Sequence, residues 1–129
     1  MKKQFFLLGI IISALGFCLT ACGGSKAVFK TVDAASATSI AAKKNIIVLD
    51  VRTPEEFTEG HLPNAVNIDI LNPSFTENIN KLDKKKKYLV YCRSGHRSTQ
   101  AVEVMKGLKF INVTNMLGGF LQWQGRVVK

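Results

Sequence analysis

Cys92 is the residue of this sequence best placed to do chemistry, because it stands between a short apolar segment and an amphipathic one. Residues 88–91 are apolar and rich in strand-favouring types, which predicts a buried strand. Residues 101–108 repeat apolar side chains at helical spacing, which predicts a helix. The cysteine is therefore expected at the carboxyl end of a strand, in a tight loop that leads into a helix.

That placement favours a reactive thiolate at Cys92. The first N–H groups of a helix lack intrahelical partners, and the helix dipole adds positive charge there. Backbone N–H groups of the loop add to this, so the pKa of the thiol should fall below its ordinary value. Gly95 allows the loop to turn tightly. Arg93, His96 and Arg97 bring cationic or titratable side chains, so we expect Cys92 to act as a nucleophile toward an anion.

The elements that must position this loop alternate between strands and helices. Strands are predicted at residues 28–32, 46–49, 65–70, 88–91 and 111–116, and helices at 34–42, 54–59, from 72 through 82, after the Cys92 loop and after Gly118. Such alternation implies an α/β fold with a central parallel sheet flanked by helices. Because ligands bind beyond the carboxyl ends of such strands, Asp50, Arg52 and Cys92 are expected to share one site.

The first residues form an export signal rather than part of this fold. Lys2 and Lys3 precede an apolar stretch, residues 5–17, which is short for a membrane span. Leu19-Thr20-Ala21-Cys22 then resembles the lipobox of bacterial lipoproteins, in which the cysteine is lipidated after cleavage before it. An ordinary signal peptide cut near Ala21, or an uncleaved anchor, is the alternative.

The predicted organisation is therefore a signal peptide at 1–21, a lipidated Cys22 with a flexible linker at 22–27, and one domain at 28–129. Gly23 resembles the residue after the cysteine in lipoproteins released to an outer membrane. We accordingly expect an exported protein of the bacterial cell envelope, on the periplasmic side of the outer membrane where one exists.

Charge and cysteine content narrow the partners. The 129-residue chain has a formal net charge of +9, and it has +7 after loss of the two lysines near the start. An exported chain seldom meets nucleic acid, so anionic headgroups or small anionic substrates are the expected partners. Lys84–Lys87 is interpreted as a solvated loop. Cys18 is lost with the signal and Cys22 is lipidated, which leaves Cys92 without a disulfide partner and gives no metal-ligand spacing.

Several sequence motifs together resemble the rhodanese family of sulfurtransferases. The match runs from about Ile46 to Trp123, with residues 29–44 compatible with the first strand and helix. The motifs are Val48-Leu49-Asp50-Val51-Arg52 with Glu55-Glu56-Phe57, Gly60-His61-Leu62-Pro63-Asn64-Ala65, Cys92-Arg93-Ser94-Gly95-His96-Arg97-Ser98 and Gly118-Gly119-Phe120-Leu121-Gln122-Trp123. Asn64 stands where the family often has glycine. The resemblance implies the rhodanese-like three-layer fold.

The resemblance also implies sulfur transfer through a Cys92 persulfide, from thiosulfate or a similar donor to a thiol or cyanide. Backbone N–H groups of residues 93–97, which include Ser94 and Gly95, would hold the persulfide, and Arg93 and His96 would help to bind the donor. Arg97 would bind the donor too, or would brace the loop by pairing with a carboxylate. No metal or organic cofactor is implied.

The roles of several further residues can be narrowed, and for three of them two interpretations are open. Asp50 and Arg52 either touch substrate or fix the loops around the site through an ion pair. Ser98 either hydrogen-bonds the sulfur or caps the helix. His61 is interpreted as a turn-stabilising histidine, and Trp123 as a core anchor.

Other functions remain open at this level. The related cysteine phosphatases and arsenate reductases use a loop one residue longer than the six residues from Cys92 to Arg97, so the loop length argues against their chemistry here. Some rhodanese-like domains are binding modules, although these usually lack the cysteine. A thiol-redox role would need a partner thiol, because the mature chain has no resolving cysteine.

Overall fold

The computed structural model describes residues 23–129; the predicted signal peptide and Cys22 lie outside the described residues. The elements are, in chain order, β1 (Val28–Val32), α1 (Ala34–Ala41), β2 (Ile46–Asp50), α2 (Pro54–Glu59), β3 (Val66–Asn67), α3 (Phe75–Asn80), β4 (Lys87–Tyr91), α4 (His96–Gly107), β5 (Asn112–Met116) and α5 (Gly119–Gln122). Among residues 23–129, no helix has both the length and the apolar character needed to cross a membrane.

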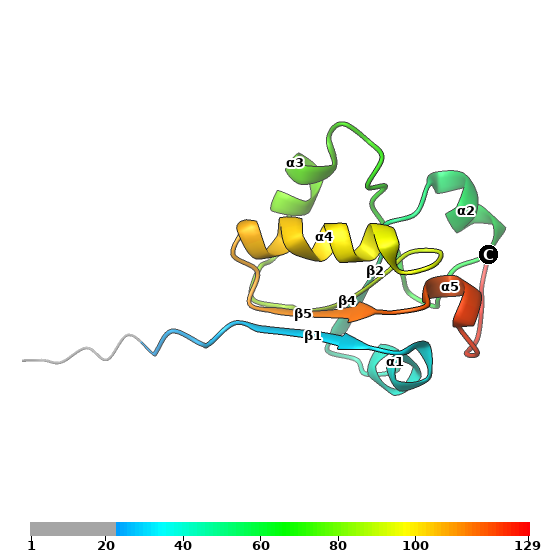
Figure 1. Cartoon of the computed structure of the whole chain (residues 1–129), viewed down its shortest axis with the longest axis horizontal. Helices are drawn as coiled ribbons and strands as arrows, with labels where there is room; N and C mark the ends of the chain where they lie inside the picture. The colour runs from blue at the N-terminus through cyan, green and yellow to red at the C-terminus, as the bar shows by residue number, and fades with distance from the viewer. Residues whose placement is uncertain (1–22) are drawn as a thin grey trace, which may run out of the picture.

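The five strands form one parallel sheet in the order β1-β5-β4-β2-β3. Helices α3 and α4 cover one face of this sheet, and α1 and α5 lie on the other side (Figure 1). The predicted α/β fold with a central parallel sheet between helical layers is therefore confirmed.

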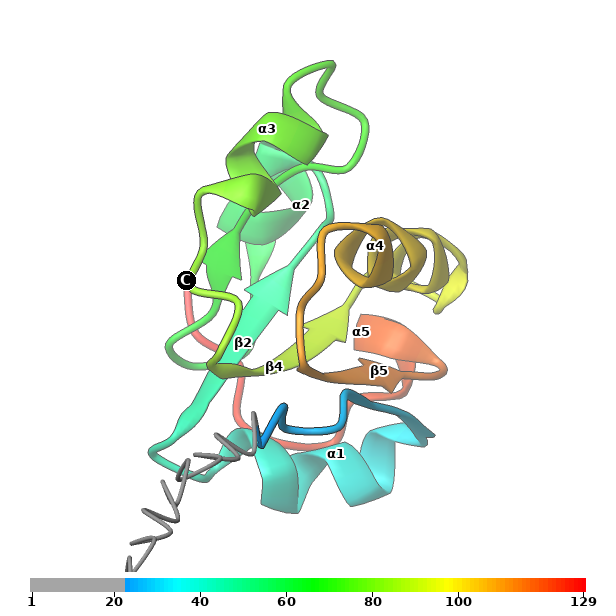
Figure 2. The same cartoon turned by 90° about the vertical axis from the view of Figure 1, so that its left-hand side faces the viewer.

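β4 is the central strand and is buried on both faces. Its side chains alternate: Tyr88 and Val90 pack toward α3 and α4, while Leu89 and Tyr91 pack toward α1. Figure 2 views the sheet from the side at which the strands begin, with α4 above β4 and β5 and α1 below them. An apolar strand with helices on both faces explains why this segment reads as a continuous apolar run.

Local capping explains the starts of two helices. Asp33 Oδ1 accepts a hydrogen bond from the Ser36 N–H at 2.7 Å, which caps α1. Thr53 and Glu56 form the predicted capping box at α2: the Glu56 N–H donates to Thr53 Oγ1 at 3.3 Å, and the Thr53 N–H donates to Glu56 Oε2 at 3.0 Å.

Three predicted boundaries were wrong. The helix predicted from residue 72 through 82 is the shorter α3, which begins after Ser74. The strand predicted at residues 65–70 is only the short β3; beyond Asn67 the chain keeps two backbone hydrogen bonds to its neighbour, from the Ile68 N–H to the Asp50 carbonyl at 2.9 Å and from the Ile70 N–H to the Val51 carbonyl at 3.1 Å. Helix α4 already begins at His96, inside the segment predicted as loop. Its first turn is polar, so the apolar periodicity did not reveal it.

Candidate active site

The Cys92 sulfur lies in a small cradle of hydrogen-bond donors at the carboxyl end of β4. The Cys92 side chain is almost fully buried, at 1% exposed. The Gly95 N–H donates to Sγ at 3.0 Å, and Ser98 Oγ lies 3.6 Å from Sγ. Ser98 is the third residue of α4 and is itself buried. The loop therefore folds back on its own sulfur, as the nucleophile prediction requires.

The hydrogen bonds around this sulfur favour its thiolate. Burial alone would raise the pKa of the Cys92 thiol. Hydrogen bonds from the backbone and side chain of Ser98, and from the backbone of Gly95 and Ser94, outweigh burial and lower the pKa below its ordinary value. Cys92 is the free cysteine of the described residues, and no disulfide competes for it there.

The Gly95 carbonyl fixes the turn of the loop. It accepts hydrogen bonds from Ser98 Oγ at 3.1 Å and from Thr99 Oγ1 at 2.8 Å. Asn115 Nδ2 in turn donates to Thr99 Oγ1 at 3.0 Å, which ties the loop to β5. Gly95 has φ 106°, a left-handed conformation that favours glycine. Ser98 does not cap α4, because the cap residue is Gly95 and makes no side-chain cap bond.

Thr99 and Asn115 were not identified from sequence. Asn115 is 4% exposed on a strand whose neighbours are buried, and a polar side chain in such a strand is the signal that points to a specific role. Nothing in the sequence places it beside Thr99, sixteen residues earlier.

The back of the loop rests on the start of α5. The Phe120 N–H donates to the Cys92 carbonyl at 2.8 Å, and the Leu121 N–H donates to the Arg93 carbonyl at 3.1 Å. A Cβ at Gly119 would come within 2.5 Å of both carbonyl oxygens. Only glycine therefore allows α5 to approach the loop this closely.

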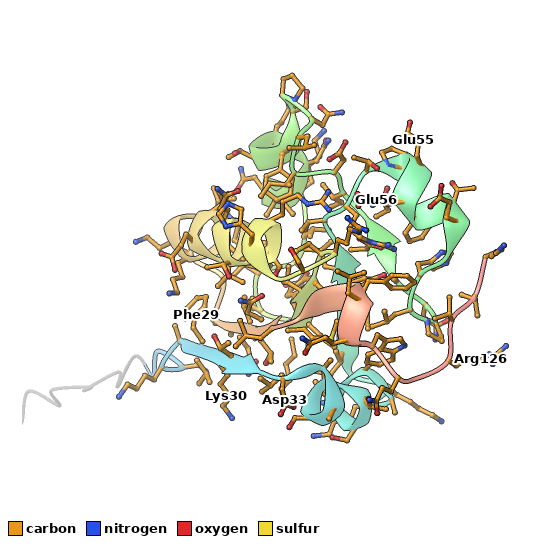
Figure 3. The ribbon with its side chains drawn as sticks, turned by 45° about the vertical axis from the view of Figure 1, so that its right-hand side comes forward. Phe29, Lys30, Asp33, Glu55, Glu56 and Arg126 are labelled. Carbon is orange, nitrogen blue, oxygen red and sulfur yellow. The ribbon has the colours of Figure 1, made fainter. Side chains whose placement is uncertain are left out.

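Arg97 joins the loop to α2 rather than facing free solvent. Its Nη1 and Nη2 donate to the Glu56 carboxylate at 2.8 and 2.9 Å. Glu56 points from α2 toward α4, whereas Glu55 points away from it (Figure 3). The hydrogen bond from Arg97 lowers the pKa of Glu56 to about 2. Of the two predicted roles of Arg97, the geometry shows the bracing role.

Asp50 and Arg52 form a buried pair beneath the site. Arg52 Nη2 donates to Asp50 Oδ2 at 2.7 Å and to the Gly60 carbonyl at 2.7 Å. The Tyr91 hydroxyl donates to Asp50 Oδ2 at 2.6 Å and accepts from the Leu62 N–H at 3.1 Å. With 0% and 3% of their surfaces exposed, Asp50 and Arg52 hold the loops around the site and do not reach a ligand outside it.

His61 and Trp123 also have the structural surroundings expected of them. His61 Nδ1 lies 2.9 Å from the Phe57 carbonyl, and its ring stacks on the Phe57 ring at 3.7 Å. Trp123 packs against the cluster around α1, and its Nε1 donates to the Arg126 carbonyl at 3.1 Å.

The mouth of the cradle carries free polar side chains and an apolar rim. Arg93, Ser94 and His96 are exposed there. Leu117 and Leu121 are 48% and 62% exposed on the side formed by α5. In residues 23–129, no three His, Cys, Asp or Glu side chains gather as a metal site requires. The arrangement suits an anionic substrate that meets a buried thiolate.

Comparison with known proteins agrees with this geometry. The Rhodanese-like domain family matches residues 33–126. YtwF of Bacillus subtilis (strain 168), which is named as a sulfurtransferase, is 38% identical over 88 residues, covering 67% of this chain and 81% of YtwF. Thiosulfate sulfurtransferase GlpE of Coxiella burnetii is 29% identical over 96 residues, covering 74% of this chain and 88% of GlpE. The chain belongs to the rhodanese-like domain family.

A solved structure gives the same result. The rhodanese-related protein of Thermoplasma volcanium is 34% identical and superposes with a TM-score of 0.68, covering 77% of this chain and 97% of the other. The match fills almost all of that solved chain, which is thus a domain of similar extent. All the elements that the structure describes lie within residues 23–129.

Proposed function

We propose that the protein is a sulfurtransferase that takes sulfane sulfur from thiosulfate or a similar donor through a persulfide on Cys92. The observation that carries the proposal is the Gly95 N–H hydrogen bond to Cys92 Sγ at 3.0 Å, within a loop that opens α4. Sulfurtransferase names among relatives of the same family support it.

The first half-reaction is a thiol attack. The Cys92 thiolate attacks the outer sulfur of thiosulfate, the sulfur–sulfur bond of the donor breaks, and sulfite leaves with the electron pair. Arg93 and His96, which are exposed at the mouth, attract the dianionic donor. The terminal sulfur of the persulfide then lies among the N–H groups that already face Sγ.

The second half-reaction restores the free Cys92 thiolate. A cyanide or thiolate acceptor attacks the terminal sulfur, the persulfide bond breaks, and the Cys92 thiolate leaves as the better-stabilised anion. The same hydrogen bonds that lower the pKa of Cys92 make it a good leaving group. Neither half-reaction consumes an oxidant or a reductant beyond its substrates.

Intact-mass measurement tests this proposal. A fragment of residues 23–129 would be incubated with thiosulfate and desalted, beside its Cys92→Ser variant. The mass should rise by one sulfur atom on the wild type alone, and cyanide should remove that sulfur as thiocyanate. If neither thiosulfate nor another sulfane donor adds sulfur, the proposal is wrong, and mixed-disulfide formation would then be examined at the same thiol.

We further propose that the chain is exported and anchored to a membrane through lipid on Cys22. The pattern of Lys2, Lys3, the apolar stretch and Leu19-Thr20-Ala21-Cys22 supports this. Incorporation of labelled palmitate into the expressed full chain, and its loss in Cys22→Ala, is the expected result. Equal labelling of both chains, or of neither, would contradict it.

A further inference from the structure

The strands of this sheet begin in register at one edge. Across the sheet, Val28 pairs with Asn112, Asn112 with Lys87, and Lys87 with Ile46, and these are the first residues of β1, β5, β4 and β2. Every segment that enters one of these strands therefore arrives at the same end of the molecule, which faces the viewer in Figure 2.

Lysines gather in these entering segments. We call them together the basic end. They are Lys26 before β1, Lys43 and Lys44 before β2, Lys84, Lys85, Lys86 and Lys87 at the start of β4, and Lys109 before β5. All of them except the half-buried Lys84 are exposed. From the sequence, Lys84–Lys87 was interpreted as a solvated loop. The fold brings lysines from three other segments to the same end of the molecule as this loop.

The basic end is not neutralised within the described part of the chain. The ion pairs of residues 23–129 join Arg52 with Asp50, Lys81 with Glu77, Arg97 with Glu56, and Lys106 with Glu103. None of these pairs includes a lysine of the basic end. Of the acidic residues, Asp83 lies at this end, and its Oδ1 accepts from the Lys85 N–H.

Most carboxylates lie instead at the carboxyl ends of the strands, toward Cys92. They are Asp33, Asp50, Glu55, Glu56, Glu59 and Asp69. The domain is therefore electrically polar along its strands, with the basic end on one side and the reactive thiol on the other.

We propose that the basic end binds the anionic surface of a phospholipid bilayer and turns the Cys92 mouth away from it. The cluster is made of lysines, whose compact charges on flexible stems suit a fluid layer of headgroups better than a fixed bidentate partner. Val28, 38% exposed at this end, adds apolar surface.

Two features argue against a nucleic acid as the occupant. Among residues 23–129, the large exposed apolar side chains are aliphatic, and Trp123, which lines a cavity beside Lys43 and Lys44, is half-buried, so little aromatic surface is available for stacking bases. The basic end also consists of lysines, and one arginine, Arg126, lies beside Lys43 and Lys44, so few side chains there can bind phosphates and guanines through pairs of bonds.

The geometry sets the orientation of the bound domain. β4 runs from Lys87 to Tyr91, so Cys92 lies five residues along the strand, about 17 Å from the Lys87 backbone. That separation exceeds the Debye length of about 10 Å at 0.1 M salt. Substrate can therefore reach the thiol from the aqueous side while the opposite end lies on headgroups.

Vesicle binding tests the proposal on the fragment of residues 23–129, which needs no lipid anchor. One set of vesicles contains phosphatidylglycerol and phosphatidylcholine in equal parts, and the other contains phosphatidylcholine alone. Binding is expected to the anionic vesicles only and should be lost in about 0.5 M salt. Lys85→Gln/Lys86→Gln should weaken binding about 25-fold, because each lysine near an anionic surface contributes roughly fivefold.

A matched variant separates this surface from net charge. Lys129→Gln removes one charge at the chain end, which lies on the other side of the molecule (Figure 1), and should bind nearly as the wild type does, whereas Lys85→Gln alone should bind about fivefold more weakly. Circular dichroism checks that both variants fold. Equal weakening by the two variants, or equal binding to neutral vesicles, would overturn the proposal. Tighter binding of single-stranded DNA than of vesicles at the same salt would assign the surface to nucleic acid instead.

Chemical footprinting tests the orientation. Acetylation of Lys43, Lys44 and Lys85 should slow on anionic vesicles, whereas that of Lys129 should not. Cys92 is the only cysteine of the fragment, so its alkylation rate by iodoacetamide reports the mouth directly and should stay unchanged on vesicles. Slowed alkylation of Cys92 with unprotected lysines would show the reverse orientation and overturn the proposal. Neither readout depends on sulfur transfer.

Discussion

Arg97 and Glu56 connect the first turn of α4 to the first turn of α2 through two hydrogen bonds, of 2.8 and 2.9 Å. The residues are 41 positions apart in sequence, and both side chains are largely covered, at 20% and 26% exposed. This pair fixes the Cys92 loop from its outer side, while β5 and α5 fix it from behind.

Replacing Glu56 should loosen the loop without unwinding α2. Glu56→Gln keeps a side chain that can complete the capping box with Thr53 but leaves Arg97 without its charged partner. We expect a loss of about 2 kcal/mol in the free energy of unfolding, measured in urea. Glu55→Gln, on the exposed side of the same turn, serves as the control. Equal stability of the two variants would show that the pair does not hold the loop.

The same pair predicts a pH dependence. The pKa of Glu56 is lowered to about 2 in the folded protein, below its ordinary value near 4.5. Its contribution to stability is therefore complete above about pH 5 and is lost as the pH falls toward 2. Urea unfolding of the wild type and of Glu56→Gln should differ by about 2 kcal/mol at pH 6 and converge near pH 2. A constant difference across that range would contradict the assignment.

Removing the Ser98 hydroxyl should raise the pKa of Cys92. The hydroxyl lies 3.6 Å from the sulfur and favours the thiolate. In Ser98→Ala, the pH profile of iodoacetamide alkylation should move to higher pH, and the rate at pH 7 should fall roughly threefold or more.

Thr99→Val provides the matched control for that experiment. It removes the other hydroxyl that donates to the Gly95 carbonyl, and this hydroxyl makes no hydrogen bond to the sulfur. If Thr99→Val shifts the profile as far as Ser98→Ala does, the effect comes from loop geometry rather than from contact with sulfur.

A methyl group at Gly119 should destabilise the domain strongly. Its Cβ would lie within 2.5 Å of the Cys92 and Arg93 carbonyl oxygens, and its φ of 57° is itself unfavourable for alanine. We expect Gly119→Ala to cost about 3 kcal/mol or more in urea unfolding. Gly107→Ala, at the end of α4 with open space around it, should instead be neutral or stabilise by up to about 1 kcal/mol. A Gly119→Ala protein as stable as the wild type would contradict the close approach of α5.

Local patterns were enough to predict most of the fold and the centre of the site. Cys92 at the end of a buried strand and the Thr53 cap of α2 each depend on a few neighbouring residues, which periodicity and capping rules describe. The early start of α4 was missed because its first turn is polar and opens from Gly95 in a left-handed conformation.

The partners across the fold were beyond such patterns. From the sequence, Arg97 was predicted to pair with a carboxylate, but Glu56 could not be identified as its partner. The hydrogen bond between Asn115 and Thr99 was not predicted. These contacts join residues from different elements, and their geometry depends on how the helices pack on the sheet. The gathering of lysines at one end has the same origin, because it follows from strand order rather than from any one segment.

The amides that cover the Cys92 and Arg93 carbonyls come from Phe120 and Leu121, near the end of the chain. The back of the loop is therefore supported only once α5 has packed against it. A chain in which α5 has not yet docked keeps the Gly95 and Ser98 groups near the sulfur in sequence but lacks the two hydrogen bonds that hold the loop from behind. The rigidity of the Cys92 loop thus depends on a segment that lies more than 25 residues away in sequence.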